Sequence, residues 1–332
     1  MNELENGKIL VTGGAGFIGS GLIWALNRLG FRNILVCDQL GEDDKWLNLA
    51  PLEFEDYFSS ATLIEYAEAD SPALREIRWV FHLGACSVTT ERDTGYLMEN
   101  NYRYTKILCD WAVSRGARFV YASSAATYGD GSNGMIDDEA KLELLRPLNA
   151  YGYSKHLFDR HAKQRGLFSN IVGLKYFNVY GPNEWHKGEM RSLVNKAYDQ
   201  VRETGKIRLF KSYRSMFKDG EQKRDFLYVK DAVDMTIHLA ATRSANGLFN
   251  LGSGKARTWV DLANAVFAAL SLPTQIEFIE MPEAIRDKYQ YFTEANIEKL
   301  KATGYRGPKF SLEQAVADYV QNYLVPRRHL EA

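Results

Sequence analysis

The stretch KILVTGGAGFIG, residues 8–19, decides the fold of this chain. A short apolar run ends in a turn that contains Gly13, Gly16 and Gly19, and a helical pattern begins at Phe17. A strand, a glycine turn and a helix in this order can hold a dinucleotide pyrophosphate. The glycines allow close approach of the backbone, and the helix N-terminus supplies unpaired N–H groups and the positive end of its dipole. The stretch therefore predicts a dinucleotide-binding βαβ unit.

Strand and helix patterns alternate outward from this stretch. Further predicted strands lie at residues 34–38, 79–83, 119–123 and 171–176. Predicted helices, which carry apolar residues at helical spacing, lie at residues 17–30, 96–115 and 151–165. Strands that alternate with helices form right-handed βαβ units, and helices then cover both faces of a parallel sheet. We therefore expect an α/β protein with a doubly wound parallel sheet.

The alternation weakens in the second half of the chain. Residues 211–223 are charged and show no periodicity. Ligands of α/β proteins bind at the carboxyl ends of the strands, so we expect this half to form a smaller lobe over that edge. The expected division is a dinucleotide-binding domain of residues 1–177, to which segments near 223–250 return, and a C-terminal substrate-binding lobe of residues 178–222 and 251–332.

The composition is that of an ordinary globular protein. The 332 residues are 45% hydrophobic and 25% charged, with a formal net charge of −1, so nothing attracts the chain generally to nucleic acid or to anionic membranes. Three cysteines without a CxxC motif fit a reducing compartment. Residues 1–7 are polar, unlike a signal peptide, and no apolar run reaches the ~18 residues of a membrane span. We expect a soluble, cytoplasmic protein with no nucleic-acid or membrane partner.

The six histidines show no spacing that is typical of metal ligands. We therefore expect no metal. His82 lies in an apolar predicted strand, so we interpret it as a core histidine whose ring nitrogens are hydrogen-bonded.

Two segments after predicted strands extend the expected cofactor site. Asp38 ends the second strand, where a carboxylate that binds the adenosine ribose belongs. A carboxylate repels a 2′-phosphate and favours NAD, but Lys45, seven residues later, could offset that repulsion, so these residues leave NAD and NADP open. The small residues Leu83, Gly84, Ala85, Cys86 and Ser87 follow the strand at 79–83 and allow the backbone to approach the cofactor. We interpret Cys86 as a packing residue without a redox role.

A tyrosine and a lysine four residues apart form the second informative motif. Tyr151 and Lys155 share one face of a predicted helix, downstream of a strand end with exposed hydroxyls that include Ser124. Free tyrosine has a pKa of about 10, and a nearby ammonium, together with a positive nicotinamide, favours the phenolate and lowers that pKa. The motif predicts a hydride-transfer site in which Lys155 also binds the cofactor ribose and Ser124 holds the substrate oxygen. The alternative, a surface tyrosine–lysine pair, fits the complete glycine turn upstream less well.

Seven segments spread over nearly the whole chain resemble one family. They are residues 11–20, 121–129, 147–155, 176–182, 186–188, 224–229 and 289–293. Together they resemble the extended short-chain dehydrogenase/reductase family, also known as the NAD-dependent epimerase/dehydratase family, which has the Rossmann fold. Residues 186–188 and 289–293 resemble, more narrowly, the branch that acts on an ADP-linked heptose.

The resemblance implies an isomerase of lipopolysaccharide core biosynthesis that inverts C-6 of the heptose in its nucleotide-sugar substrate, ADP-heptose. Bound NADP, preferred over NAD, takes hydride to give a transient ketone, and the hydride returns to the opposite face after the sugar has turned over. Each configuration of the hydroxyl needs a base, and the family pattern assigns these roles to Tyr151 and Lys187. Without the resemblance, Lys187 would be interpreted as a loop lysine. The resemblance also implies a homo-oligomer.

Further site residues follow from the resemblance and from the segments above. The expected cofactor contacts are Gly13, Gly16, Phe17, Ile18, Gly19, Asp38, Gln39, Lys45, Leu83, Gly84, Ala85, Cys86, Ser87, Asn100, Lys155, Val179 and Lys187. The expected substrate contacts are Asn178, Glu189, Lys196, Phe210, Lys211, Ser212, Arg224 and Tyr289. Arg224 suits the diphosphate because its planar guanidinium pairs well with phosphate. Glu189 and Lys196 replace a serine and a histidine of familiar members, and Ser60 replaces a lysine.

Two alternatives remain. Another nucleotide-sugar epimerase or a dehydratase shares this scaffold, but a dehydratase would carry an acid pair after the strand-end hydroxyl, where Ser124 is followed by Ala125 and Ala126. A non-catalytic dinucleotide sensor also fits the fold. It would be expected to lack Tyr151 or Lys155, and this chain has both.

Overall fold

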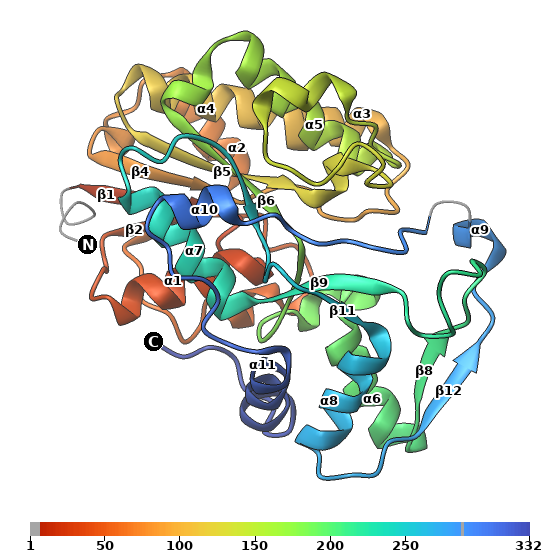
Figure 1. Cartoon of the computed structure of the whole chain (residues 1–332). Helices are drawn as coiled ribbons and strands as arrows, with labels where there is room; N and C mark the ends of the chain where they lie inside the picture. Colours follow the sequence, from red (N-terminus) through yellow and green to blue (C-terminus); the bar gives the residue numbers. More distant parts are fainter. Residues whose placement is uncertain (1–6, 287–288) are drawn as a thin grey trace.

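Seven parallel strands form the central sheet of the computed structural model, which describes residues 7–286 and 289–332 (Figure 1). In spatial order they are β10 (Gly247–Leu251), β6 (Ile171–Tyr176), β5 (Arg118–Ser124), β4 (Ile77–His82), β1 (Lys8–Thr12), β2 (Ile34–Cys37) and β3 (Asp56–Phe58). Each neighbouring pair is parallel. The doubly wound fold is thereby confirmed, with strand ends shifted by at most two residues.

Helices cover both faces of this sheet, so its strands are buried on either side. One face carries α1 (Phe17–Arg28) and α7 (Val229–Ala241), and the other carries α2 (Ser60–Glu68), α4 (Tyr104–Ser114) and α5 (Ala150–Gln164) (Figure 1). In β6 and β10 every residue is buried. The strand order reverses between β1 and β4, because β2 and β3 lie on one side of β1, whereas β4, β5 and β6 lie on the other. Ligands of such sheets bind at the carboxyl ends of the strands at this point.

The helix predicted at residues 96–115 is divided in the structure. It comprises α3 (Thr94–Leu97), a π-helical segment η3 (Met98–Arg103) and α4. π-Helical turns occur frequently at functional sites, and this one carries Asn101, whose side chain is fully buried. The π-helical segment η3 therefore marks this part of the helix as a candidate part of a functional site.

The second half of the chain forms smaller sheets beside the central one. Strands β11 (Ala256–Thr258), β9 (Lys223–Tyr228) and β7 (Asn178–Tyr180) form one sheet, and β12 (Ile276–Ile279) pairs with β8 (Ile207–Phe210). The remaining α-helices are α6 (Leu193–Thr204), α8 (Trp259–Ala269), α9 (Glu283–Arg286), α10 (Glu298–Ala302) and α11 (Leu312–Tyr319). Figure 1 shows β8, β12, α6 and α8 on the side away from the central sheet. The division into two lobes at the expected residues stays a prediction.

Short helical turns complete the described chain. They are η1 (Asp44–Asn48), η2 (Pro72–Leu74), η4 (Ala125–Tyr128), η5 (Glu139–Leu144), η6 (Leu167–Ser169), η7 (Trp185–Met190) and the π-helical η8 (Val320–Leu324). Among the helices of the described residues, none is both long and apolar enough to cross a membrane. His82 is buried, and its ring nitrogens lie 2.7 Å from Thr12 Oγ1 and 2.9 Å from Thr105 Oγ1, which confirms its interpretation as a core residue.

Candidate active site

The glycine turn leaves no room for side chains. A Cβ atom on Gly13 would lie 2.6 Å from the backbone nitrogen of Gly84, and one on Gly19 would lie 2.0 Å from the carbonyl oxygen of Gly13. Gly13 also has a φ of +68°, in the region that favours glycine. Gly16 caps α1 without a side-chain hydrogen bond, so the first N–H groups of α1 have no partner from the cap. This turn fits the pyrophosphate of a dinucleotide.

Asp38 is placed between this turn and a lysine. Its Oδ2 accepts a hydrogen bond from the Ala15 N–H at 2.9 Å, and its Oδ1 accepts one from the Gln39 N–H at 2.7 Å. Lys45 Nζ lies 2.9 Å from Oδ1. The Gln39 side chain in turn donates to Ser60 Oγ at 2.5 Å. The Asp38 carboxylate, which would repel the 2′-phosphate of NADP, is therefore paired with the Lys45 ammonium, which would attract it.

Asn101 joins the segment after β4 to the helix that carries Tyr151. Its Oδ1 accepts from the Cys86 N–H at 2.8 Å, and its Nδ2 lies 3.0 Å from the Cys86 carbonyl oxygen and 2.9 Å from Ser154 Oγ. Its neighbour Asn100, an expected cofactor contact, is half-buried and donates to the Tyr96 carbonyl oxygen. The signal for Asn101 was available, because it lies four residues after the buried Leu97, on the apolar face of the predicted helix.

The structure brings Ser124, Tyr151 and Lys155 together. Ser124 ends β5, and Tyr151 lies in the first turn of α5, where Asn149 Oδ1 accepts from the Gly152 N–H at 2.7 Å and caps the helix. The Ser124 hydroxyl, which accepts from the Ala126 N–H at 3.1 Å, lies close enough to Tyr151 to lower the pKa of the phenol. One turn later, Lys155 Nζ donates to the Ala122 carbonyl oxygen of β5 at 2.8 Å. A phenol, a hydroxyl and an ammonium thus meet at the carboxyl end of the sheet.

The expected lowering of the Tyr151 pKa depends on a bound nicotinamide as well as on Lys155, and it stays a prediction. Burial raises the pKa of Tyr151, against the opposing effect of the nearby Ser124 hydroxyl. Burial also lowers the pKa of Lys155 to about 8, although the nearby Asp159 carboxylate raises it. Both shifts have the same cause, since a group removed from water disfavours its charged form. The Lys155 ammonium is directed at the Ala122 carbonyl oxygen.

Lys187 lies beside the glycine turn. It belongs to η7, and its ammonium lies 5.2 Å from the centre of the Phe17 ring, at the first residue of α1. In the described part of the chain no carboxylate forms an ion pair with it. Burial lowers the pKa of Lys187, and the Glu184 carboxylate raises it. Burial favours the neutral amine, which is the form that a general base requires.

Most of the expected substrate contacts are exposed or half-buried, and several are bonded to other protein groups. The side chain of Glu189 is 97% exposed and lies 3.3 Å from Lys196 Nζ. Lys211 pairs with Glu280 at 2.7 Å, and the Ser212 N–H donates to Asp219. Asn178 is exposed in β7. These contacts show no preformed binding site.

Arg224 is the exception among them. It is 6% exposed, and its guanidinium lies 5.0 Å from the centre of the Tyr289 ring and 5.6 Å from that of Trp259. Trp259 Nε1 donates to the Tyr289 hydroxyl at 2.9 Å and holds the two rings together. Arg224 donates to the Lys223 carbonyl oxygen, and among the described residues it has no ion pair with a carboxylate. Burial of an unpaired cation is costly, so the arrangement favours an anionic ligand here. Phe210 meets the Tyr289 ring edge-on.

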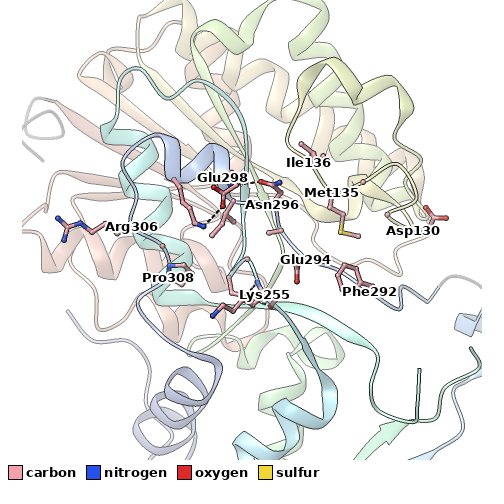
Figure 2. A pocket seen from close by; sticks show the side chains of 18 residues that line it. Asp130, Met135, Ile136, Lys255, Phe292, Glu294, Asn296, Glu298, Arg306 and Pro308 are labelled. Carbon is pink, nitrogen blue, oxygen red and sulfur yellow. Dashed lines mark hydrogen bonds and ion pairs between the residues drawn. The ribbon is translucent and has the colours of Figure 1, made fainter. Parts of the chain in front are cut away.

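The surface pockets lie away from this group. Figure 2 shows one of about 650 Å³, lined by residues that include Asp130, Met135, Phe292 and Glu294. A second, of about 1170 Å³, lies between α1, α7 and the C-terminal segment. Neither of these two pockets is lined by Ser124 or by any other predicted site residue. We therefore identify the candidate site from the positions of its side chains and not from a pocket. In the described residues no group of three His, Cys, Asp or Glu side chains could hold a metal ion.

Comparisons with known proteins agree with this geometry. The NAD dependent epimerase/dehydratase family matches residues 9–252. A protein of Nitratidesulfovibrio vulgaris (strain DP4), named ADP-L-glycero-D-manno-heptose-6-epimerase, is 50% identical over 316 residues, which cover 95% of this chain and 97% of the relative. A Fusobacterium nucleatum protein of the same name is 48% identical and covers 95% of this chain and 98% of the relative.

Solved structures show the same likeness. The structure of Helicobacter pylori ADP-L-glycero-D-manno-heptose-6-epimerase has a TM-score of 0.76 and 28% identity, covering 96% of this chain and 97% of that one. A UDP-N-acetylglucosamine 4-epimerase from Methanobrevibacter ruminantium has a TM-score of 0.81 at 22% identity, covering 97% and 99%, and shows the fold alone. The match over residues 9–252 and the relatives at 48–50% identity show that this chain belongs to the NAD dependent epimerase/dehydratase family, enzymes that work with a pyridine nucleotide.

Proposed function

We propose that this protein inverts C-6 of the heptose in ADP-D-glycero-D-manno-heptose and gives ADP-L-glycero-D-manno-heptose. The observation that carries the proposal is the position of Lys187, a half-buried lysine without an ion-pair partner among the described residues, beside the glycine turn. Tyr151 approaches from a different element, α5. Inversion requires proton transfer for two configurations of one hydroxyl, and two separately held groups supply it. The relatives named as ADP-heptose epimerases support this substrate.

The chain's own residues handle the proton and the orientation of the sugar. A bound pyridine nucleotide supplies a hydride acceptor and donor at C-6. Tyr151 takes the hydroxyl proton of one epimer, and Lys187 takes that of the other; each returns its proton to the carbonyl oxygen in the reverse direction. Ser124 hydrogen-bonds the same oxygen beside Tyr151. The buried Lys155 binds the ribose next to the nicotinamide and adds positive charge near Tyr151.

We propose NADP as the nucleotide. The ion pair between Asp38 and Lys45 balances the carboxylate, and the hydrogen bond from the Ala15 N–H keeps that carboxylate against the glycine turn. Lys45 then remains near the ribose to meet a 2′-phosphate. The other proposed contacts are Gly13, Gly16, Phe17, Ile18, Gly19, Gln39, Leu83, Gly84, Ala85, Cys86, Ser87, Asn100 and Val179.

On the substrate side, we propose that Arg224 binds the diphosphate. Its buried, unpaired guanidinium between Tyr289 and Trp259 supports this role. Asn178, Phe210, Lys211 and Ser212 are proposed to contact the rest of the nucleotide sugar, with Glu189 and Lys196 at the edge.

The test is to incubate the purified protein with ADP-D-glycero-D-manno-heptose, without added cofactor, and to follow the product by proton NMR. Conversion to the L-glycero epimer supports the proposal, and mass spectrometry of the denatured protein then identifies the nucleotide. No conversion, even with added NADP or NAD, contradicts the substrate assignment. Turnover of another nucleotide sugar would then identify a different epimerase or a dehydratase, and no turnover of any would favour a sensor.

A further inference from the structure

Asn48 connects three segments that lie far apart in the sequence. It is the last residue of η1 and is 2% exposed. Its Nδ2 lies 2.9 Å from the Ala15 carbonyl oxygen, 3.1 Å from the Asn183 carbonyl oxygen and 3.2 Å from His186 Nδ1. One amide therefore joins the glycine turn to the residues that directly precede Lys187.

Residues 329–330 hold the other side of this connection. His329 Nδ1 donates to Asn48 Oδ1 at 2.9 Å, and the Leu330 N–H donates to Asn183 Oδ1 at 2.9 Å. The His329 ring also packs edge-on against Trp185 in η7, with ring centres 4.9 Å apart. Leu330 is buried. The segment that carries Lys187 is thus fixed by a part of the chain more than a hundred residues away.

The segment is also anchored at Glu184, which accepts hydrogen bonds from Ser192 and Tyr319, but η7 itself packs loosely. None of the six residues of η7 is buried, and Gly188 interrupts the helix with φ +52° and ψ −122°. Before η7, Asn183 has a φ of +75°, a conformation that non-glycine residues adopt only when their surroundings over-determine it. Its side chain supplies that constraint by bonding both Leu330 N–H and Ser20 Oγ. Contacts from outside η7 therefore set the position of Lys187.

We propose that His329, acting through Asn48 and Trp185, is a positioning residue for Lys187. The inference rests on the proposed role of Lys187 as the proton-transferring group for one of the two epimers. A base displaced by about 1 Å can lose two orders of magnitude in rate, so the contacts of His329 matter for the step that uses Lys187. Tyr151, held by α5 and Ser124, does not depend on them.

The two epimers allow the inference to be tested within one enzyme. Each epimer is mixed rapidly with the holoenzyme, and the absorbance of the reduced nicotinamide gives the rate of hydride transfer. Lys187→Ala first identifies the epimer that Lys187 serves. His329→Ala should slow hydride transfer from that same epimer by about tenfold and leave the other within about twofold. His329→Asn keeps an N–H donor at the position of Nδ1 and should restore most of the loss.

The control is His238→Ala, which removes a partly buried imidazole that is bonded to Thr303 and packed against Tyr305. It should not distinguish the epimers. Equal slowing of both epimers by His329→Ala, or no slowing of either, would overturn the inference while leaving Lys187 as a base. If Lys187→Ala itself fails to distinguish the epimers, the two-base proposal is wrong and this inference with it.

Discussion

The residues around Ser124 and Tyr151 lie on a buried network of charges, whereas Glu189 lies in solvent and its partner Lys196 is half-buried. Beneath Ser124, Asp159 of α5 and Lys175 of β6 form an ion pair of 2.7 Å and are almost inaccessible. Lys175 also donates to Thr127 Oγ1 at 2.7 Å, and Thr127 donates to the Ser124 carbonyl oxygen at 2.8 Å.

The remaining acceptor sites of Asp159 are also used. Tyr121 and Ser123 of β5 donate to its two oxygens at 2.7 and 2.8 Å. A buried ion pair is tolerable only when its other hydrogen bonds are satisfied in this way. The Glu189–Lys196 pair has no such support, and exposed pairs contribute about 0–1 kcal/mol. The backbone at Ser124 is therefore preset, while the exposed contacts can rearrange when a substrate binds.

The largest effect should come from removing both proposed bases. Tyr151→Phe combined with Lys187→Ala should lower the rate of epimerisation by at least about 10³-fold, because each group supplies a proton-transfer step. Mass spectrometry should still find the nucleotide, since the glycine turn is unchanged. Turnover of the double variant at the wild-type rate would contradict the two-base proposal.

Breaking the buried network should have the next largest effect. Asp159→Asn should lower the free energy of unfolding by about 3–5 kcal/mol, because Lys175 is left buried without its partner. Urea denaturation measures the change. Adding Lys175→Met to Asp159→Asn removes the unpaired charge and should recover most of the stability. A change below about 1 kcal/mol for Asp159→Asn alone would mean that the network does not hold the site.

Substitution of Arg224 should change the KM for the nucleotide sugar without lowering the free energy of unfolding. Arg224→Met should raise the KM for the nucleotide sugar by about tenfold to a hundredfold, as expected for the loss of charge-assisted hydrogen bonds. It should not lower the free energy of unfolding, because a buried cation without a carboxylate partner is removed. Arg208→Met, at an exposed arginine that faces Glu277, is the control and should change neither quantity. An unchanged KM for Arg224→Met would exclude its role with the diphosphate.

The smallest effect should come from the exposed pair. Glu189→Gln should change the free energy of unfolding by less than about 0.5 kcal/mol, since a surface substitution rarely does more. The KM should stay within about threefold of the wild-type value, because a side chain in solvent loses little when its charge is removed. Steady-state kinetics and urea denaturation measure both. A tenfold rise in KM would show that Glu189 moves into the site when substrate binds.

Local patterns predicted the parts of the site that depend on short-range geometry. The glycine turn, the strand end at Ser124 and the helix with Tyr151 and Lys155 follow from hydrophobic period and turn chemistry, which act within a few residues. Local patterns did not predict the burial of the Tyr151 phenol, which raises its pKa, because burial depends on the packing of distant segments. The buried Asn101, which links Cys86 to Ser154, was not predicted, although its place on the apolar helix face carried the signal.

The sequence by itself thus determined the α/β class, the positions of most central strands along the chain and the spacing of the expected hydride-transfer residues. Only the tertiary structure decided that Arg224 lies unpaired between two aromatic rings and that Lys187 lies against Phe17. It alone placed His329 on Asn48, 281 residues earlier in the chain. The physical reason is that periodicity and turn preferences carry information over one or two turns of backbone, whereas burial and long-range hydrogen bonds exist only after the whole chain has packed.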